Sequence, residues 1–246
     1  MNAPYLEKDI SLKMNNKGFT LIELIVSMAV GLVVMAAIYA ATEMGQRSSV
    51  AVERKVVAQQ DARAALDIMA LEIGMASFNP NFATGIWVDG PTGTCGNPSG
   101  NQTFKGIQEA TENSITVEMD IRAATAGSSP DGDVNDPNEI IRYNYANQYI
   151  TRETGCGGGA QAFLGAQSGQ PRELRVVNPA GVSLFRYYNG VGSELVPGTH
   201  LPASIPDIRR IRITLVVDTE AIDRSLNKRR RTISSISIIP RNHAIN

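Results

Sequence analysis

The longest apolar segment of the chain runs from residue 19 to residue 41, and its single charged side chain is Glu23. At about 1.5 Å of rise per residue, a helix of this length would extend roughly 35 Å, which is enough to cross the hydrocarbon core of a bilayer. Lysines precede the segment, and basic residues on that side favour a cytoplasmic N-terminus. The pattern therefore predicts one membrane-spanning helix.

Residues 42–78 are more polar, but no strong helix breaker occurs before Pro80. Apolar residues recur at helical spacing in the second half of this segment, with charged residues between them. The apolar stripe consists of Ala62, Leu66, Met69 and Ile73. We therefore expect the helix to continue through residues 42–78 and to pack against a head domain formed by residues 79–246.

Alternating apolar and polar residues predict several strands in the head. The expected strands cover residues 115–121, 141–145, 148–151, 173–177, 182–188, 209–218 and 232–239. The first of these predicts a half-buried strand, because its apolar residues share one face and Thr116, Glu118 and Asp120 share the other. The Gly-rich intervals 79–113 and 153–172 are predicted to be loops. A long helix packed on an antiparallel sheet gives an α+β fold class.

A small residue, Gly18, stands directly before the apolar span and is followed by Phe19. The string from Lys17 to Leu24, KGFTLIEL, closely resembles the type IV prepilin processing motif. The resemblance implies that a membrane peptidase cuts between Gly18 and Phe19 and then methylates the new N-terminal Phe19. Residues 1–18 would be the leader, and a start at Met14 instead of Met1 would give the short leader typical of such proteins.

The position of Glu23 has a physical interpretation of its own. A carboxylate is costly inside a bilayer, so an acid in an apolar span is by default a functional residue. Cleavage would create an α-ammonium group on Phe19, which could pair with Glu23 of a neighbouring subunit. Such a pair would set the register between subunits, because sliding would leave a buried charge unpaired. The alternative is an acid at the edge of an ordinary anchor, which leaves the Gly-Phe pair unexplained.

A second resemblance concerns residues 63–67 and 72–76, RAALD and EIGMA, which are similar to a segment of PilW-family minor pilins. It implies the type IV pilin fold and a minor subunit that primes or tips a pilus. Such subunits support pilus assembly, adhesion or twitching motility. Their partners would be other pilins, bound through the N-terminal helix, and the prepilin peptidase. The protein would cross the inner membrane once, with its head in the periplasm and, once in a pilus, outside the cell.

Two other functions fit the same sequence. One is a minor pseudopilin of type II secretion, similar to the J-type subunit, which keeps the acid that Glu23 represents. The other is a membrane-anchored binding protein that never polymerises. Mutation of Glu23 would separate the membrane-anchored binding protein from the pilin and the pseudopilin, because a simple anchor does not need that charge.

Cys95 and Cys156 both lie in Gly-rich loops. Outside the cytosol a disulfide between them is plausible. Closing a loop of about 60 residues would contribute roughly 4 kcal/mol on the chain-entropy account. This spacing departs from the pilin pattern of a bridge near the C-terminus.

The segment from Asp131 to Glu139 begins like a calcium loop, with the candidate ligands Asp131, Asp133, Asn135 and Glu139. The sixth and twelfth positions of the EF-hand pattern are Asp136 and Arg142, so the full motif fails. We favour a solvated turn over a calcium site, and no other cofactor is expected.

Composition narrows the function classes further. The formal net charge is −1, which argues against a dedicated nucleic-acid binder. The basic run from Lys228 to Arg231 is expected to be a solvated hairpin loop between the last two strands. Two His and two Cys are too few for most multi-ligand metal centres. Because no hydrolase, nucleotide-binding or metalloprotease motif occurs, we do not expect an enzyme.

Overall fold

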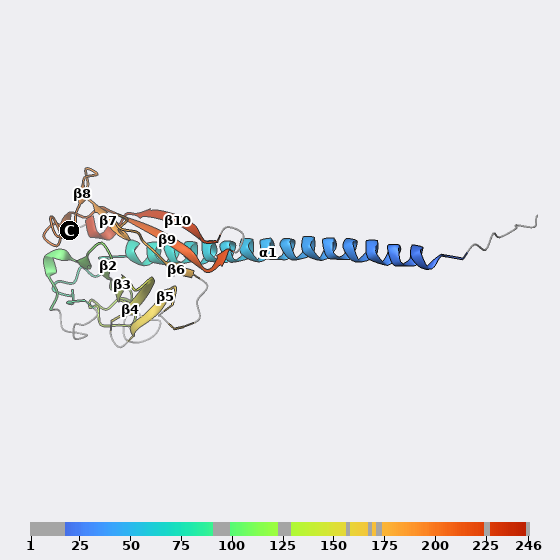
Figure 1. Cartoon of the computed structure of the whole chain (residues 1–246). Coiled ribbons are helices and arrows are strands. Elements are labelled where there is room, and N and C mark those ends of the chain that lie inside the picture. Colours follow the sequence, from blue (N-terminus) through green and yellow to red (C-terminus); the bar gives the residue numbers. More distant parts are fainter. Residues whose placement is uncertain are drawn as a thin grey trace, which may run out of the picture. The chain divides into compact units, whose positions relative to one another are not determined.

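The computed structural model describes residues 18–90, 99–122, 129–155, 158–166, 169–170, 174–223 and 227–244. Contacts divide the chain into two units, Met1–Ser49 and Val50–Asn246, and the boundary falls inside the long helix α1 (Leu21–Gly74), blue to cyan in Figure 1. The other described elements are η1 (Gln102–Phe104), β1 (Ile107–Ala110), β2 (Ser114–Glu118), β3 (Ile140–Ala146), β4 (Tyr149–Thr154), β5 (Gly159–Leu164), β6 (Leu174–Val176), β7 (Phe185–Tyr188), β8 (Glu194–Leu195), η2 (Ile205–Asp207), β9 (Arg210–Asp223), β10 (Lys228–Ile238) and η3 (Arg241–Ala244).

The first unit contains the apolar part of α1. This part is long and apolar enough to cross a membrane, and none of its most apolar stretch is buried within the chain. Its large apolar side chains, such as Leu32 at 72% exposure, lie open along the whole segment. Side chains of this kind need an apolar environment that the chain itself does not supply, such as lipid or the helices of other subunits. The N-terminal helix is thus consistent with a membrane anchor.

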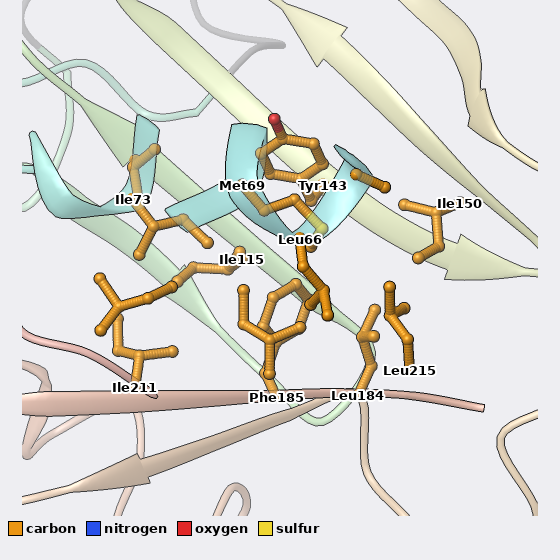
Figure 2. Close-up of a cluster of buried hydrophobic side chains, with 14 of the residues drawn as sticks. Leu66, Met69, Ile73, Ile115, Tyr143, Ile150, Leu184, Phe185, Ile211 and Leu215 are labelled. Atoms are coloured by element: carbon orange, nitrogen blue, oxygen red, sulfur yellow. The ribbon is translucent and has the colours of Figure 1, made fainter. Parts of the chain in front are cut away.

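The second unit contains the rest of α1, which buries one face. The predicted stripe is confirmed, because Ala62, Leu66, Met69 and Ile73 are all almost completely buried. Two further alanines, Ala58 and Ala65, widen the buried face. Figure 2 shows Leu66, Met69 and Ile73 on the helix pointing into one cluster with side chains from the strands.

Strands of the second unit form two antiparallel sheets in the described residues. The first has the order β1-β2-β3-β4-β5, and the second has the order β10-β9-β7-β8 with β6 paired to β9 beside β7. Ile115 and Tyr143 of the first sheet and Phe185 of the second meet the helix in a common core (Figure 2). This arrangement confirms the α+β class and the packing of the helix on antiparallel sheets, with two sheets instead of one.

Three described strands were not predicted: β1, β5 and β8. β5 lies in the interval 153–172, which was predicted to be a loop, and its first four residues are exposed. Their sequence, Gly-Ala-Gln-Ala, has no apolar alternation, so only pairing with β4 reveals the strand. The loop prediction was therefore wrong over this segment, and it was also wrong over β1, which lies in the interval 79–113.

The half-buried character predicted for the strand at 115–121 was also wrong. β2 is buried on both faces, and its polar residues Thr116 and Glu118 are as inaccessible as its apolar ones. The Thr116 hydroxyl donates to Glu109 of β1, and a Glu118 carboxylate oxygen accepts from the Val88 amide. A small second cluster containing Trp87 and Val88 lies next to this face. Chain segments distant in sequence thus cover the side that the alternation assigned to solvent.

The basic run near the C-terminus belongs to β10 and not to a loop. Arg231 makes two bonds with Asp218, at 2.8 and 3.0 Å, and Arg230 lies 2.5 Å from Asp223. Both acids belong to β9, the antiparallel neighbour of β10. The prediction of a solvated loop was wrong, because β9 supplies acids across the ladder that sequence alone does not pair with the run.

Candidate functional site

The N-terminal junction lies just ahead of α1. Gly18, Phe19 and Thr20 have no regular secondary structure, and the helix begins at Leu21. Phe19 is 90% exposed, and apart from the two flanking residues nothing lies within 4 Å of the position that a side chain on Gly18 would take. The peptide bond between Gly18 and Phe19 is therefore accessible within this chain, as a protease substrate requires.

Thr20 and Glu23 form a reciprocal cap at the start of α1. The Thr20 amide and hydroxyl both donate to Oε2 of Glu23, each at 2.9 Å, and the Thr20 hydroxyl accepts from the Glu23 amide at 3.3 Å. This is a capping box, in which the residue before the helix and its third residue satisfy each other's amides. Thr-x-x-Glu is the sequence signal of such a cap, but it was not among the predicted features.

The cap uses only one of the two carboxylate oxygens of Glu23. Within the described residues, Oε1 of Glu23 has no hydrogen bond. Glu23 therefore caps the first turn of the helix and keeps one carboxylate oxygen without a partner among the described residues. This geometry is compatible with a cationic partner from another chain.

The junction of α1 with the head is held by Glu72. Arg152 of β4 donates to both carboxylate oxygens of Glu72, at 2.7 and 3.1 Å, and the hydroxyl of Tyr143 donates to the same carboxylate. Burial raises the pKa of Tyr143, and the adjacent Glu72 raises it further. The hydrogen bond to Glu72 also raises the pKa of Arg152. This cluster ties the last turn of the helix to the first sheet.

The structure does not gather the four candidate calcium ligands around one point. Glu139 turns toward the backbone, where its two oxygens accept from the amides of Ile121, Arg122 and Asp136 at 2.9 to 3.0 Å. Asp133 accepts from the amide and side chain of Asn135, while Asp131 is exposed. The described residues contain no group of three or more His, Cys, Asp or Glu side chains arranged to hold a metal ion. Calcium binding therefore stays a sequence prediction, and the geometry of Glu139 argues against it.

Several acids near this loop are buried without a complete set of partners. Oε1 of Glu118, Oδ1 of Asp120 and Oδ2 of Asp136 have no hydrogen bond among the described residues. Burial raises the pKa of Glu118 to about 8, and nearby Asp89 adds to the shift. Burial likewise raises the pKa of Asp120, with repulsion from neighbouring carboxylates adding to the effect. Sequence reasoning placed Glu118 and Asp120 on the solvent face of a strand and Asp136 in a solvated turn, whereas the structure buries all three.

Cys95 and Cys156 lie outside the described residues, as do Met14 and Lys17. The disulfide and the position of the start codon therefore stay predictions.

Comparisons with known proteins address the N-terminus. Residues 13–39 match a family model described as the prokaryotic N-terminal methylation motif. A comparison with curated proteins gives no significant match. Among solved structures, a type IV-like pilin from Thermus thermophilus is similar, with 10% sequence identity, a TM-score of 0.44, and coverage of 76% of this chain and 96% of that one. That similarity is too low to indicate a shared function of the head.

The matched residues include Gly18, Phe19 and Glu23, the residues on which the processing prediction was built. The chain therefore carries a prokaryotic N-terminal methylation motif at the start of a long apolar helix.

Proposed function

We propose that the chain is a minor pilin of a type IV pilus, similar to the PilW family. A prepilin peptidase would cut between Gly18 and Phe19 and methylate Phe19. Residues 19–41 would anchor the protein in the inner membrane, with the head in the periplasm. The subunit would then enter the priming complex or the tip of the filament.

The observation that supports this function best is the position of Glu23. It is the one acid in an exposed apolar segment, it lies four residues beyond Phe19, and one of its oxygens is uncommitted among the described residues. A new α-ammonium group on Phe19 of an adjacent subunit would neutralise that oxygen. In an apolar filament interior an unpaired carboxylate is strongly unfavourable, so the pair would select a single register.

Replacement of Glu23 tests the proposal in the native host. We expect Glu23→Ala to be processed normally but to fall at least about tenfold in purified filaments, because the charge pair is lost. Glu53→Ala is the matched control, since Glu53 is an exposed acid further along the same helix, outside the apolar segment. Normal incorporation of the Glu23 variant would contradict the role as a subunit.

A type II pseudopilin would use the same N-terminal chemistry. A deletion strain separates the two systems, because loss of a minor pilin reduces surface pili and loss of a pseudopilin reduces protein secretion. We expect the pilus defect.

A second candidate function is ligand binding by the head, and a cavity favours it. The cavity has a volume of about 440 Å³, within the range of small-molecule sites. Phe78, Phe82 and Trp87 line it together with Lys105, so its walls suit an aromatic body and its cation suits a carboxylate. Trp87 is the protein's only tryptophan.

The fluorescence of Trp87 therefore reports on this cavity alone. Benzoate is the probe, and benzyl alcohol is the neutral control of the same size. We expect a saturable change with benzoate that Phe82→Ala weakens. An unchanged spectrum would remove this candidate.

A further inference from the structure

The outward face of the second sheet carries a basic cluster, defined here as the arginine patch: Arg186 and Tyr188 of β7 with Arg210 and Arg212 of β9. In β7, Phe185 and Tyr187 alternate with Arg186 and Tyr188 and point into the core. In β9, Ile211 does the same between Arg210 and Arg212. The strand period of two therefore places the three arginines and Tyr188 on the opposite face, away from the core.

Two of the arginines are held against one ring. The guanidinium carbon of Arg210 lies 4.3 Å from the centroid of the Tyr188 ring, and that of Arg212 lies 5.5 Å from it. Stacking uses the faces of the guanidinium groups and leaves their N–H edges available. Neither guanidinium group has a hydrogen bond or an ion pair with any residue in the described part of the chain. The donors are thus oriented but unused.

The third arginine increases the unfavourable charge. Arg186 is the direct cross-strand partner of Arg212, and like charges in that position destabilise a sheet. The nearest acid, Glu194, lies 3.8 Å from Arg186, which is long for an ion pair. The patch therefore has an excess of positive charge that an external anion would relieve.

The same unit carries the complementary charge. Asp131 and Asp133 lie at the surface of the segment 129–139, defined here as the acidic loop, with Asp120 buried behind them. Burial raises the pKa of Asp133, and repulsion from Asp131 adds to the shift. No lysine or arginine among the described residues forms an ion pair with these three acids. The acidic loop lacks a cation in the same way that the arginine patch lacks an anion.

Nucleic acid fits the arginine patch poorly. Single-stranded binding uses exposed aromatic rings on which bases stack, whereas Tyr188 is 8% exposed and covered by guanidinium groups. The basic run in β10 does not extend the patch, because Asp218 and Asp223 neutralise its arginines. A compact group of carboxylates on a protein surface is the better counterpart.

We propose that the arginine patch of one chain binds the acidic loop of a second copy of the same chain. Guanidinium groups and carboxylates pair through two parallel N–H···O bonds, which fixes direction as well as register. The contact lies in the head and is separate from the helix contact made by Glu23. It extends the proposed subunit role, because it gives the head its own means of recognising a neighbour.

Charge reversal with complementation tests the proposal on the full-length chain. Two differently tagged copies are produced in the same membrane, solubilised in mild detergent and co-purified. The basic-reversed variant carries Arg210→Glu and Arg212→Glu, and the acid-reversed variant carries Asp131→Arg and Asp133→Arg. We expect each variant to lose self-association by about tenfold or more, because like charges then meet at the interface.

The mixture of the two variants is the decisive sample. The intact arginine patch of one variant and the intact acidic loop of the other can still pair, so we expect association to return close to that of the unmodified chain. Misfolding of either variant would not be repaired by mixing. Failure of the mixture to associate would overturn the proposal, as would unchanged self-association of the single variants.

A control distinguishes general charge effects, and a second readout distinguishes the two proposals. Arg241→Glu with Lys228→Glu makes the same charge change at exposed sites outside the patch and should leave association unchanged. A loss with this control would show that net charge is responsible.

Cleavage at Gly18 and filament incorporation are measured in parallel, because they report on the subunit role whether or not the heads pair. Binding of single-stranded DNA by the arginine patch, lost in the basic-reversed variant, would identify a different partner and overturn the proposal.

Discussion

The two parts of α1 differ in how their apolar side chains are kept from water. In the first part, apolar side chains such as Met35, at 68% exposure, have no cover within the chain. In the second part, the equivalent Met69 is completely buried under strands of the head. Both parts belong to one continuous helix, so the difference lies in their side chains and in the surroundings that those side chains require. The first part is apolar on all sides and the second on one face only.

This contrast shows where each part obtains its stability. A helix that is apolar all round needs a surrounding apolar phase, while an amphipathic helix is stabilised by its own domain. The head can therefore fold around residues 50–74 whatever surrounds the first part. The proposed function needs that independence, because such a subunit would move from a bilayer into a filament.

The same substitution in the two parts should give the largest difference. We expect Met69→Ala to lower the free energy of unfolding of the head by about 3 kcal/mol, because it removes buried volume and leaves a cavity. Met35→Ala, the matched control, should leave that free energy unchanged. Denaturant unfolding of the full chain in detergent measures both. Equal effects would contradict the separation of the two parts.

The end of the second part depends on its ion pair with the head. Glu72→Gln removes the charge that Arg152 and Tyr143 contact and leaves Arg152 partly buried without its counterion. We expect a loss of about 2 kcal/mol, below the value for a fully buried pair because the two side chains keep some exposure to solvent. Glu53→Gln changes an exposed acid on the same helix and should have little effect. A loss in both variants would point to helix propensity instead of the ion pair.

The stability of the head should also depend on pH through Glu118, a group absent from the first part. Its pKa is about 8 in the folded head, so the folded state binds more protons than the unfolded state above the ordinary glutamate pKa. Stability should then fall as pH rises. The buried His243, whose pKa burial lowers to about 4, acts in the opposite direction between about pH 4 and 6.5.

The clearest window is therefore pH 6.5 to 8, in which His243 is neutral in the folded state and loses most of its remaining charge in the unfolded state near the lower end. We expect the free energy of unfolding of the head to fall by about 1.5 kcal/mol across this window. Glu118→Gln should remove most of that fall. A pH dependence that is unchanged in this variant would exclude Glu118 as its cause.

The smallest effect is expected at the beginning of the first part. Thr20→Ala removes one side of the capping box while leaving Glu23 in place. Amide exchange at the start of α1 should become about fivefold faster, and the stability of the head should not change. Unchanged exchange would mean that the cap does not order the first turn.

Local patterns in the sequence were sufficient to predict the long helix and most of the strands. Helical spacing identified the buried stripe from Ala62 to Ile73, and alternation identified β3 and β9. The processing junction was also readable, because Gly18, Phe19 and Glu23 are close in sequence and their chemistry does not depend on distant contacts. The Thr20 cap has an equally local signal, the Thr-x-x-Glu spacing of Thr20 and Glu23.

Features that depend on distant segments could not be predicted. The ion pair of Glu72 with Arg152 joins residues 80 positions apart, and no local pattern marks either partner. Glu118 and Asp120 looked like the solvent face of a strand until other segments covered them. The arginine patch is likewise assembled from two strands whose pairing is set by tertiary structure.

The chemical state of the mature N-terminus tests the central claim most directly. Mass spectrometry of the protein isolated from its native host should give an N-terminal peptide that begins at Phe19 and carries one added methyl group. Glu23 would then be the fifth residue of the mature chain. A protein that keeps the bond between Gly18 and Phe19 intact in the cell envelope would contradict the account.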